Sequence, residues 1–445
     1  MSSPSVEVVV LNWNGRPHLE RCLEALADQL DPGLEWLVTV VDNGSDDESV
    51  SWLERSYPEG PTRLGRGEKG RLRLRALEEN LGFCGGNNAA AEASDADWVV
   101  LLNNDTAPEP EWLGHLVDAA RSAPEDVAAV SGRLISWDRS RVDFVRGVMT
   151  FDGHAFQHGY RKPLEQWPGP ASGSELPFAC GGNMIVRRRS FVDAGLFDPA
   201  YFAYLEDVDL GWRLWSRGER VLYCAEATAR HRSMATSDQL GQDRRGFLFE
   251  RNAFLTAYKN YDEAHFGKMM PAVLFTFLAR TRTLLADNNA GGAAIRRDPY
   301  CDGTPPAMEV PPQPTLWQKW RGWGTRELTR RGVRKARRRL ATWLAPVEEA
   351  APVLESVLVD DPRSLAQLQA ASHLIDHLES ASIRRRDVQS QRRRPDGEIF
   401  ERFPLYVVPT YPGDESLFAD PGFRALLPRD VPVQRATLAD LMEMG

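Results

Sequence analysis

The sequence Trp98-Val99-Val100-Leu101-Leu102-Asn103-Asn104-Asp105-Thr106 contains the segment that decides the fold of this chain. Its first five residues are apolar, which is typical of a strand buried on both faces of a parallel sheet. Three polar residues follow, and Pro108 and Pro110 then prevent further strand pairing. Ligands of open α/β sheets bind at the carboxyl ends of strands. The pattern therefore predicts a divalent metal site at Asp105, with a plain turn built from Asn and Asp as the alternative.

Two further segments show the same succession of a buried strand and a polar loop. Residues 6–11 predict a strand that ends at Asn12-Trp13-Asn14-Gly15, and residues 37–41 predict a strand that ends at Asp42. A helix is expected after each strand, so tandem β-α units predict a mainly parallel, doubly wound α/β sheet. In dinucleotide-binding folds, an acidic residue placed like Asp42 bonds a ribose hydroxyl or a base edge.

A glycine-rich segment, Asn80-Leu81-Gly82-Phe83-Cys84-Gly85-Gly86-Asn87-Asn88, precedes a helix expected over residues 87–94. Its glycines would let a ligand approach the backbone, and a helix N-terminus favours anions. The alternatives are a flexible loop and simple capping of the helix by the two Asn residues. No GxGxxG motif follows the first strand and the chain has no GxxxxGK[ST] motif, which argues against a classical dehydrogenase and a P-loop NTPase.

The composition indicates a soluble globular protein of one large or two to three ordinary domains. The chain has 445 residues, 42% of them hydrophobic and 26% charged, and a net charge of -9, which argues against general nucleic-acid binding. The N-terminus lacks the pattern of a signal peptide, and no apolar run is long enough to span a membrane. Neither a zinc site nor a disulfide framework is expected, because no CxxC pair occurs among the five cysteines: Cys22, Cys84, Cys180, Cys224 and Cys301.

Four motifs, at residues 11–15, 41–47, 80–88 and 102–105, occur in the order seen in family 2 glycosyltransferases, and the chain most resembles the rhamnosyltransferase-like branch of that family. The resemblance implies a GT-A nucleotide-sugar-binding fold and a UDP- or dTDP-sugar donor. It places a further small-residue segment, residues 178–186, beside the donor sugar. The residues that it assigns to donor binding are Asn12, Asn14, Asp42, Asn43, Ser45, Asp46, Asn80, Gly82, Phe83, Gly86, Asn87, Asn103, Asn104, Cys180, Gly181 and Gly182.

The segment Asn103-Asn104-Asp105 stands where the family carries its metal-binding DxD motif. Because the first position is Asn, Asp105 is the one anionic ligand expected there, although Asn can offer a carbonyl oxygen to a hard cation. The resemblance assigns His231 to the same Mn²⁺ or Mg²⁺ ion or to the donor phosphates. Arg230 and Arg232 are the alternative groups for holding the diphosphate.

Three acids lie close together at Glu206, Asp207 and Asp209. Acids suit a helix N-terminus for electrostatic reasons alone, which is the structural alternative. Inverting glycosyl transfer needs a carboxylate to deprotonate the acceptor hydroxyl, and the resemblance places this base at the Glu206-Asp207 pair. We expect Asp207 to be the base and Glu206 to support it or to bind the acceptor. Trp212 and Arg213 are predicted on the acceptor side, although Arg213 is also spaced for a salt bridge with Asp209.

The rest of the chain is expected to be mostly helical. Helices are predicted over residues 246–261, 269–285 and 364–380, and a strand over residues 405–408. Between Lys319 and Arg339 ten Lys or Arg residues face one acid, a net charge of +9, which leaves -18 for the rest of the chain. With the tryptophans of residues 317–343, this run suggests peripheral membrane contact, a solvated helix or a subunit interface.

These expectations combine into one functional hypothesis. We expect a GT-A transferase domain at residues 1–265, a helical, linker and basic segment at 266–345, and an accessory or oligomerising module at 346–445. The enzyme would be cytoplasmic, or peripheral on the inner face of the membrane. It would move a hexose, with rhamnose as one candidate, from the nucleotide to a hydroxyl of a glycan or lipid-linked glycan with inversion. The alternative is a catalytically weak nucleotide-sugar-binding or assembly module.

Overall fold

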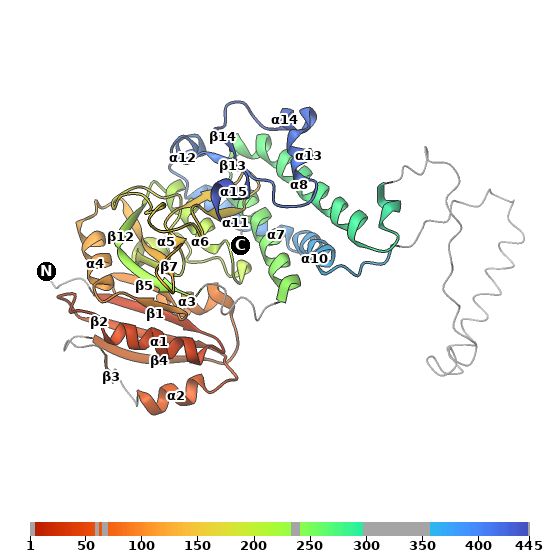
Figure 1. Ribbon diagram of the computed structural model, residues 1–445. Coiled ribbons are helices and arrows are strands. Elements are labelled where there is room, and N and C mark those ends of the chain that lie inside the picture. The colour runs from red at the N-terminus through yellow and green to blue at the C-terminus, as the bar shows by residue number, and fades with distance from the viewer. Residues whose placement is uncertain (1–4, 58–61, 65–69, 233–240, 297–356, 444–445) are drawn as a thin grey trace, which may run out of the picture. The chain divides into compact units, whose positions relative to one another are not determined.

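The computed structural model describes residues 5–57, 62–64, 70–232, 241–296 and 357–443 (Figure 1). The elements up to Asp193 are β1 (Val6–Asn12), α1 (Arg16–Ala27), β2 (Trp36–Asn43), α2 (Ser49–Ser56), β3 (Thr62–Arg63), β4 (Gly70–Leu77), α3 (Gly82–Ala93), β5 (Trp98–Asn103), β6 (Thr106–Pro108), α4 (Trp112–Ser122), β7 (Val127–Ser136), β8 (Val142–Phe144), β9 (Gly147–Met149), β10 (Ala155–Gln157), β11 (Asn183–Arg187) and α5 (Arg188–Asp193). The later elements are the 3-10 turn Pro199–Tyr201, α6 (Glu206–Ser216), β12 (Arg220–His231), α7 (Gly241–Asn260), α8 (Glu263–Asn288), the 3-10 turn Gly292–Arg296, α10 (Pro362–Asp376), α11 (Leu378–Ser390), α12 (Asp396–Arg402), β13 (Leu405–Val407), α13 (Asp414–Ala419), α14 (Pro421–Leu426), β14 (Val433–Arg435) and α15 (Leu438–Leu441).

A large mixed sheet organises the first half of the chain. Its strands pair in the order β3-β4-β2-β1-β5-β11-β7-β12-β6, and β8 pairs with β7. The run β4-β2-β1-β5 is parallel, whereas β11 is antiparallel to both of its neighbours, β5 and β7. The predicted α/β class is therefore confirmed. The parallel pairs are the run β4-β2-β1-β5, which the β-α units build, and β7–β12 in the other half of the sheet.

Strand β5 lies at the centre of this sheet, as its sequence predicts. Residues Trp98 to Leu102 are all nearly inaccessible to solvent, because β1 and β11 flank the strand and helices cover the sheet. The expected strands at residues 6–11 and 37–41 are confirmed as β1 and β2. Strand β4 had not been expected, although its alternation of Arg with Leu72 and Leu74 is the period-two pattern of a strand with one buried face.

Helix α3 begins earlier than its sequence suggests. It starts at Gly82, so the glycine-rich segment forms the first turns of the helix and is not a loop before it. Gly82 has a φ of +73°, and the Asn80 side chain accepts a hydrogen bond from its amide at 2.8 Å. A Cβ on Gly86 would lie 2.3 Å from the Leu11 side chain, so this glycine allows α3 to pack tightly on β1.

The C-terminal helices pack against the part of the chain that precedes them. Helices α10 and α11 lie along α7, α12 contacts α6, and β13 contacts β9 (Figure 1). The chain up to Thr283 and from Pro362 onward accordingly forms one compact unit, and Leu284–Asp361 forms a second. The basic, tryptophan-rich run at residues 317–343 lies outside the described residues.

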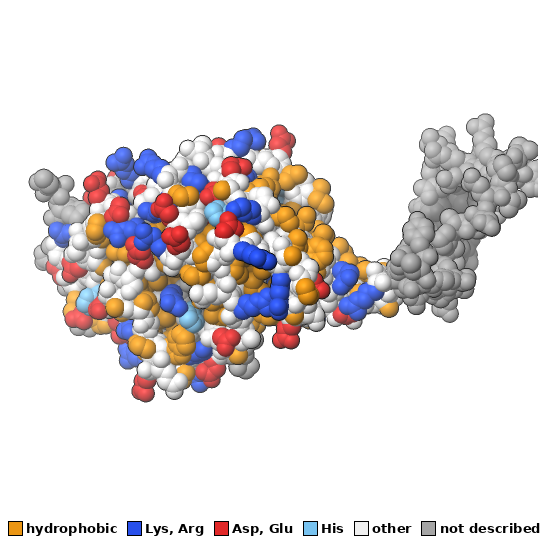
Figure 2. Space-filling model, turned by 90° about the horizontal axis from the view of Figure 1, so that it is seen from above, with side chains coloured by type: hydrophobic (Ala, Val, Ile, Leu, Met, Phe, Trp, Pro, Cys, Tyr) orange, Lys and Arg blue, Asp and Glu red, His pale blue; other side chains and the backbone are white. Residues whose placement is uncertain are grey.

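Helix α8 carries an exposed apolar face. Leu274, Phe275 and Leu278 are 47%, 52% and 54% exposed, and Figure 2 shows hydrophobic side chains gathered over the part of the molecule where α8 lies. None of the described helices is both long and apolar enough to cross a membrane.

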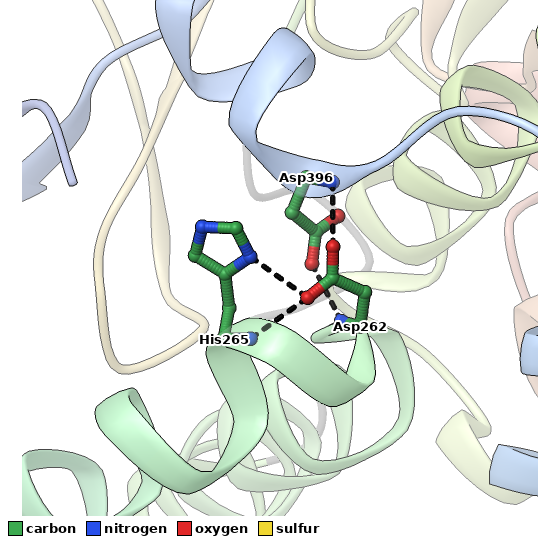
Figure 3. A group of neighbouring side chains, drawn as sticks. All are labelled: Asp262, His265 and Asp396. Carbon is green, nitrogen blue, oxygen red and sulfur yellow. Dashed lines mark hydrogen bonds and ion pairs between the residues drawn. The ribbon is translucent and has the colours of Figure 1, made fainter. Parts of the chain in front are cut away.

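A hydrogen-bonded clamp fastens the C-terminal region to the start of α8 (Figure 3). The amide of Asp262 donates to the Asp396 carboxylate at 2.6 Å, and the amide of Asp396 donates to the Asp262 carboxylate at 2.9 Å. The other oxygen of Asp396 accepts from Trp212 Nε1 and Arg392, and that of Asp262 accepts from the amide and ring of His265. These three residues, Asp262, His265 and Asp396, also lie close enough to hold a metal ion, but their carboxylate oxygens already accept strong donors. We therefore interpret the group as a structural clamp.

Removing the Asp396 carboxylate should destabilise the protein. The Asp396→Ala substitution would leave the Asp262 amide, the Trp212 indole and the Arg392 guanidinium without their acceptor in a buried site. We expect the free energy of unfolding, measured by urea titration, to fall by about 3 kcal/mol. Asp376→Ala, at an exposed position of α10, is the matched control and should change it by less than about 0.5 kcal/mol. Equal effects of the two substitutions would contradict the clamp.

Candidate active site

The carboxyl ends of β1, β2 and β5 bring the first group of predicted residues together. Asn12 is paired with Asp42 in the β1–β2 register, and Leu11 is paired with Asn103 in the β1–β5 register. Because these strands are parallel, the loops that follow them leave the sheet at the same edge. Motifs separated by up to ninety residues thus meet in one place, as the sequence predicts.

Asp42 organises the loop that follows β2. Its carboxylate is 1% exposed and accepts hydrogen bonds from Asn12 Nδ2 at 3.0 Å and from the amide and hydroxyl of Ser45 at 2.9 and 2.8 Å. The Asn14 side chain accepts from the amide of Asp46 at 2.9 Å. Asn12, Asn14, Asp42, Ser45 and Asp46 therefore form one network, in which Asp42 orients groups nearer the surface.

The residues predicted around the start of α3 divide into two sets. Asn43 bonds Asn80 and the backbone of residues 81 and 82, so it fixes the entry into the helix beside the site. Asn87, in contrast, donates to the Phe83 carbonyl within α3 and is 2% exposed. Asn87 and Gly86 are therefore both packed inside the fold, Gly86 tightly against β1. Neither is a ligand contact.

Asp105 and His231 meet although they lie 126 positions apart in the chain. His231 Nε2 lies 3.1 Å from Asp105 Oδ1, and His231 Nδ1 lies 3.2 Å from Asp143 Oδ2. Burial alone would raise the pKa of Asp105, but the neighbouring histidine outweighs it and the pKa is lowered. Burial would lower the pKa of His231, yet Asp143 and Asp105 raise it well above its usual range. Asp143 had not been expected, because nothing in its local sequence marks it.

This group has the chemistry of a divalent cation site. A carboxylate oxygen and an imidazole nitrogen 3.1 Å apart can both bind one Mn²⁺ or Mg²⁺ ion. A carboxylate on the far nitrogen of a ligating histidine fixes the tautomer and the ring orientation, which is the position of Asp143. The Asn104 side chain is directed towards Asn12 and not towards this group, because its Nδ2 donates to Asn12 Oδ1 at 2.8 Å.

Two glycines let the start of β11 approach the site. A Cβ on Gly182 would lie 2.5 Å from the Asn103 side chain, and the amide of Gly181 donates to Asp207 Oδ2 at 3.1 Å. The ring of Phe83 lies against Gly181 on the same side. Burial raises the pKa of the Cys180 thiol well above its usual range, so this cysteine is not a nucleophile at neutral pH.

Glu206 and Asp207 open helix α6 next to these glycines. Glu206 is 7% exposed, and its Oε2 atom has no hydrogen-bond partner among the described residues. Burial, and then the charge of Asp207, raise the pKa of Glu206 well above its usual range. Burial also raises the pKa of Asp207, although the amides of Gly181 and Val208 oppose the shift. A carboxylate with a raised pKa, partly open and fixed by two amides, is suited to accept a proton.

The segment before Glu206 has an unusual backbone conformation. Phe202, Tyr204 and Leu205 have φ values of 62°, 70° and 63°, in the left-handed region that side chains disfavour. Asn252 on α7 holds this segment by donating to the carbonyls of Tyr201, Ala203 and Tyr204 at 2.8–3.0 Å. The sequence of α7 gave no signal for this role, because a buried Asn within a helix has no local pattern.

Loss of this support should lower catalysis more than stability. In Asn252→Ala, the carbonyls of Ala203 and Tyr204 lose the Asn252 donor, whereas the Tyr201 carbonyl still accepts from Arg251. The start of α6 can then relax, so we expect kcat to fall by about 10- to 100-fold. The affinity for the nucleotide should be unchanged, as measured by calorimetry. Asn260→Ala, two turns further along α7, removes a buried bond to Asp209 without touching the strained segment. A similar loss of kcat in both variants would show that destabilisation alone is responsible.

Trp212 and Arg213 do not lie on the acceptor side. Trp212 is 1% exposed, packs against Tyr261 and Phe400 and donates to Asp396. Arg213 is 5% exposed, and its guanidinium binds Asp209 at 2.9 Å and the carbonyl of Leu196 at 2.7 Å. The predicted salt bridge between Arg213 and Asp209 is thus present. Neither Trp212 nor Arg213 is available to bind an acceptor.

Comparison with known proteins identifies the class to which this site belongs. The model of the family "Glycosyl transferase family 2" matches residues 7–194. An N-acetylglucosaminyl-diphospho-decaprenol L-rhamnosyltransferase of Mycobacterium tuberculosis is 31% identical over 245 residues, which cover 50% of this chain and 75% of that protein. The O-antigen biosynthesis protein RfbC of Myxococcus xanthus is 28% identical over 243 residues, 53% of this chain and 18% of that protein.

Two solved structures are also similar. GalNAc-T7 with UDP, GalNAc and Mn²⁺ has a TM-score of 0.46 at 16% identity, over 61% of this chain and about half (51%) of that chain. The mannosyltransferase PcManGT of Pyrobaculum calidifontis, in complex with GDP-Man and Mn²⁺, has a TM-score of 0.41 at 18% identity, over 66% of this chain and 80% of that chain.

The chain belongs to glycosyltransferase family 2. Within that family it is a rhamnosyltransferase-like member, and its activity is that of a glycosyltransferase.

Proposed function

We propose that the protein is an inverting, metal-dependent glycosyltransferase that moves a hexose, with rhamnose the leading candidate, from a UDP- or dTDP-sugar to a hydroxyl of a lipid-linked glycan. The observation that carries the proposal is the contact of Asp105 with His231 at the carboxyl ends of β5 and β12, with Asp207 bound to the Gly181 amide just before β11, the neighbour of β5. The similarity to a rhamnosyltransferase that acts on a diphospho-decaprenol glycan supports the choice of sugar and acceptor.

The chain's own residues supply three functions in this reaction. The network of Asp42, Asn12 and Ser45 shapes the nucleotide site. Asp207 accepts the proton of the acceptor hydroxyl while that oxygen forms its bond to the anomeric carbon. The bond between this carbon and the diphosphate breaks on the opposite face, and the diphosphate leaves with the electron pair, which inverts the anomeric configuration.

Asp105 and His231 would hold a divalent cation, and such an ion would supply positive charge to the leaving diphosphate. Gly181 orients Asp207 through its amide, and the neighbouring Glu206 is buried.

A donor screen tests this proposal directly. The thermal unfolding midpoint is measured with UDP-, dTDP- and GDP-sugars, each with and without Mn²⁺. We expect UDP- or dTDP-sugars to raise the midpoint in a Mn²⁺-dependent manner and the best donor to be turned over, with NMR showing inversion at the anomeric carbon. If several donors bind and none is turned over, the binding-module alternative replaces the enzyme. If no donor raises the midpoint, the nucleotide-sugar assignment fails.

A further inference from the structure

A second compartment opens beside the metal-binding group. It has a volume of about 580 Å³, and its lining includes Trp137, Arg141, Arg161 and Arg232. We call it the basic pocket. Asp143 and His231 also line it, so the pocket shares with the active site the histidine that faces Asp105. A molecule in the basic pocket would therefore lie next to the reacting groups.

The basic pocket has cations that no carboxylate of the described residues neutralises. Arg161 and Arg232 make no ion pair with a carboxylate of the described residues, whereas Arg230, the neighbour of Arg232, pairs with Glu109 at 3.2 Å. The guanidinium of Arg232 lies 4.4 Å from the centre of the Trp137 ring, which restrains it without using its hydrogen-bond donors. Two guanidinium groups in a pocket, without a carboxylate partner in the described parts of the chain, are suited to a phosphate group.

The backbone fixes the position of Arg161. Its φ is 61°, its amide donates to the Val142 carbonyl at 2.8 Å, and the Val142 amide donates to the carbonyl of Lys162 at 3.0 Å. Arg141, on the same wall, donates to the Arg161 carbonyl at 2.6 Å and to Glu443 at 2.9 Å. Arg141 is thus neutralised by Glu443, and Arg161 is held in place with its charge available.

The far wall of the basic pocket comes from the end of the chain. The amide of Gly159 donates to the Leu441 carbonyl at 2.6 Å, and the amide of Glu443 donates to the Tyr160 carbonyl at 2.8 Å. Leu441 and Glu443 lie outside the segment matched by the family model, residues 7–194, as do His231 and Arg232. The pocket therefore combines residues of the matched segment, Arg161 among them, with residues that follow it.

We infer that the basic pocket binds a phosphate or diphosphate ester carried by the acceptor, with Arg161 and Arg232 contacting its oxygens. This inference rests on the proposed function, in which the acceptor hydroxyl must reach Asp207. The donor diphosphate belongs on the Asp105 side of His231, with the ends of β1, β2 and β5, whereas the basic pocket lies with Asp143 and β8. With the donor diphosphate on one side of His231 and the acceptor phosphate on the other, both substrates would lie next to the reacting groups.

Calorimetry on metal-free full-length protein, kept in a chelator, tests the inference because it isolates the basic pocket from the cation site. The probes are inorganic diphosphate and farnesyl diphosphate. We expect binding that the double substitution Arg161→Ala, Arg232→Ala weakens by about 10- to 100-fold. Arg189→Ala, on the exposed surface of α5, should leave it unchanged. The affinity of both variants for UDP with Mn²⁺ should equal that of the unaltered protein.

The outcomes separate the two proposals. Arginine-dependent binding of both probes supports the inference, and tighter binding of farnesyl diphosphate identifies a lipid-linked ester as the source of the phosphate. Binding of neither probe, or binding that the double substitution does not change, overturns the inference. The proposed function would stand in that case, because it is judged by the donor screen. An equal loss of UDP affinity in the double variant would instead assign the two arginines to the donor and also overturn the inference.

Discussion

Replacing Asp207 with asparagine is expected to abolish glycosyl transfer while the affinity for the donor nucleotide stays the same. The substitution keeps the shape of the side chain, and its amide oxygen can still accept from the Gly181 amide. It removes the group that takes the proton of the acceptor hydroxyl. Since general-base catalysis contributes about 10²- to 10⁴-fold, kcat should fall by at least the lower figure. Steady-state kinetics and nucleotide calorimetry measure the two quantities separately.

The matched control for this experiment is Asp193→Asn, at an exposed position of α5. It should change neither kcat nor the nucleotide affinity. Unchanged turnover in Asp207→Asn would exclude the residue as the base, and a parallel loss of nucleotide affinity would point to a disturbed site.

The pH dependence gives an independent check on the base. Asp207 acts only when it is deprotonated, and burial raises its pKa above the usual value of a carboxyl group. Activity should therefore be lost, as the pH falls, at a higher pH than an ordinary aspartate would give. In the residual activity of Asp207→Asn, this acidic limb should be absent.

Removing the Asp105 carboxylate is expected to abolish the metal dependence of nucleotide binding. In Asp105→Ala, the cation would lose its one anionic protein ligand at the end of β5, while His231 would keep its contact with Asp143. We expect the Mn²⁺-dependent rise in the unfolding midpoint with UDP or dTDP to disappear and kcat to fall by about 100-fold or more.

Asp118→Ala, at an exposed position of α4, controls for the loss of an aspartate as such. Asp105→Asn repeats the test with the side-chain volume preserved, which separates the loss of charge from the loss of packing in a buried site. If Asp105→Ala and Asp118→Ala affect nucleotide binding equally, Asp105 does not belong to the cation site. For Asp143→Asn we expect a smaller fall in kcat, about 10- to 100-fold, because Asp143 acts through His231.

The part of the site that the sequence reveals is the part built by strand ends. Asn12 and Asp42 directly follow a run of buried apolar residues, and Asp105 follows one after two Asn residues. Parallel strands bring such positions together whatever the details of the loops. The pairing of Asp105 with His231 was expected from the family resemblance, and the structure places the two in contact.

The residues that the sequence does not reveal interact with partners that are distant in sequence. Asp143, Asn252 and Glu443 lie on a short strand, inside a helix and at the chain end, and each acquires its role from a partner far away in sequence. Trp212 shows the converse difficulty. Its place next to the acidic cluster suggested a substrate contact, but the packing of α12 on α6 buries it.

The clamp between Asp262 and Asp396 limits how this protein can diverge in evolution and where it can be truncated. Trp212, one turn beyond the proposed base, donates its indole N–H to a residue almost two hundred positions away. Helix α6 is thus covered by sequence from the C-terminal region. A piece that ends after β12, at His231, would keep α6 but lose α12 and so expose Trp212 to water. The core and its C-terminal cover should therefore be inherited together. Exchanging acceptor preference between relatives should require the transfer of both segments.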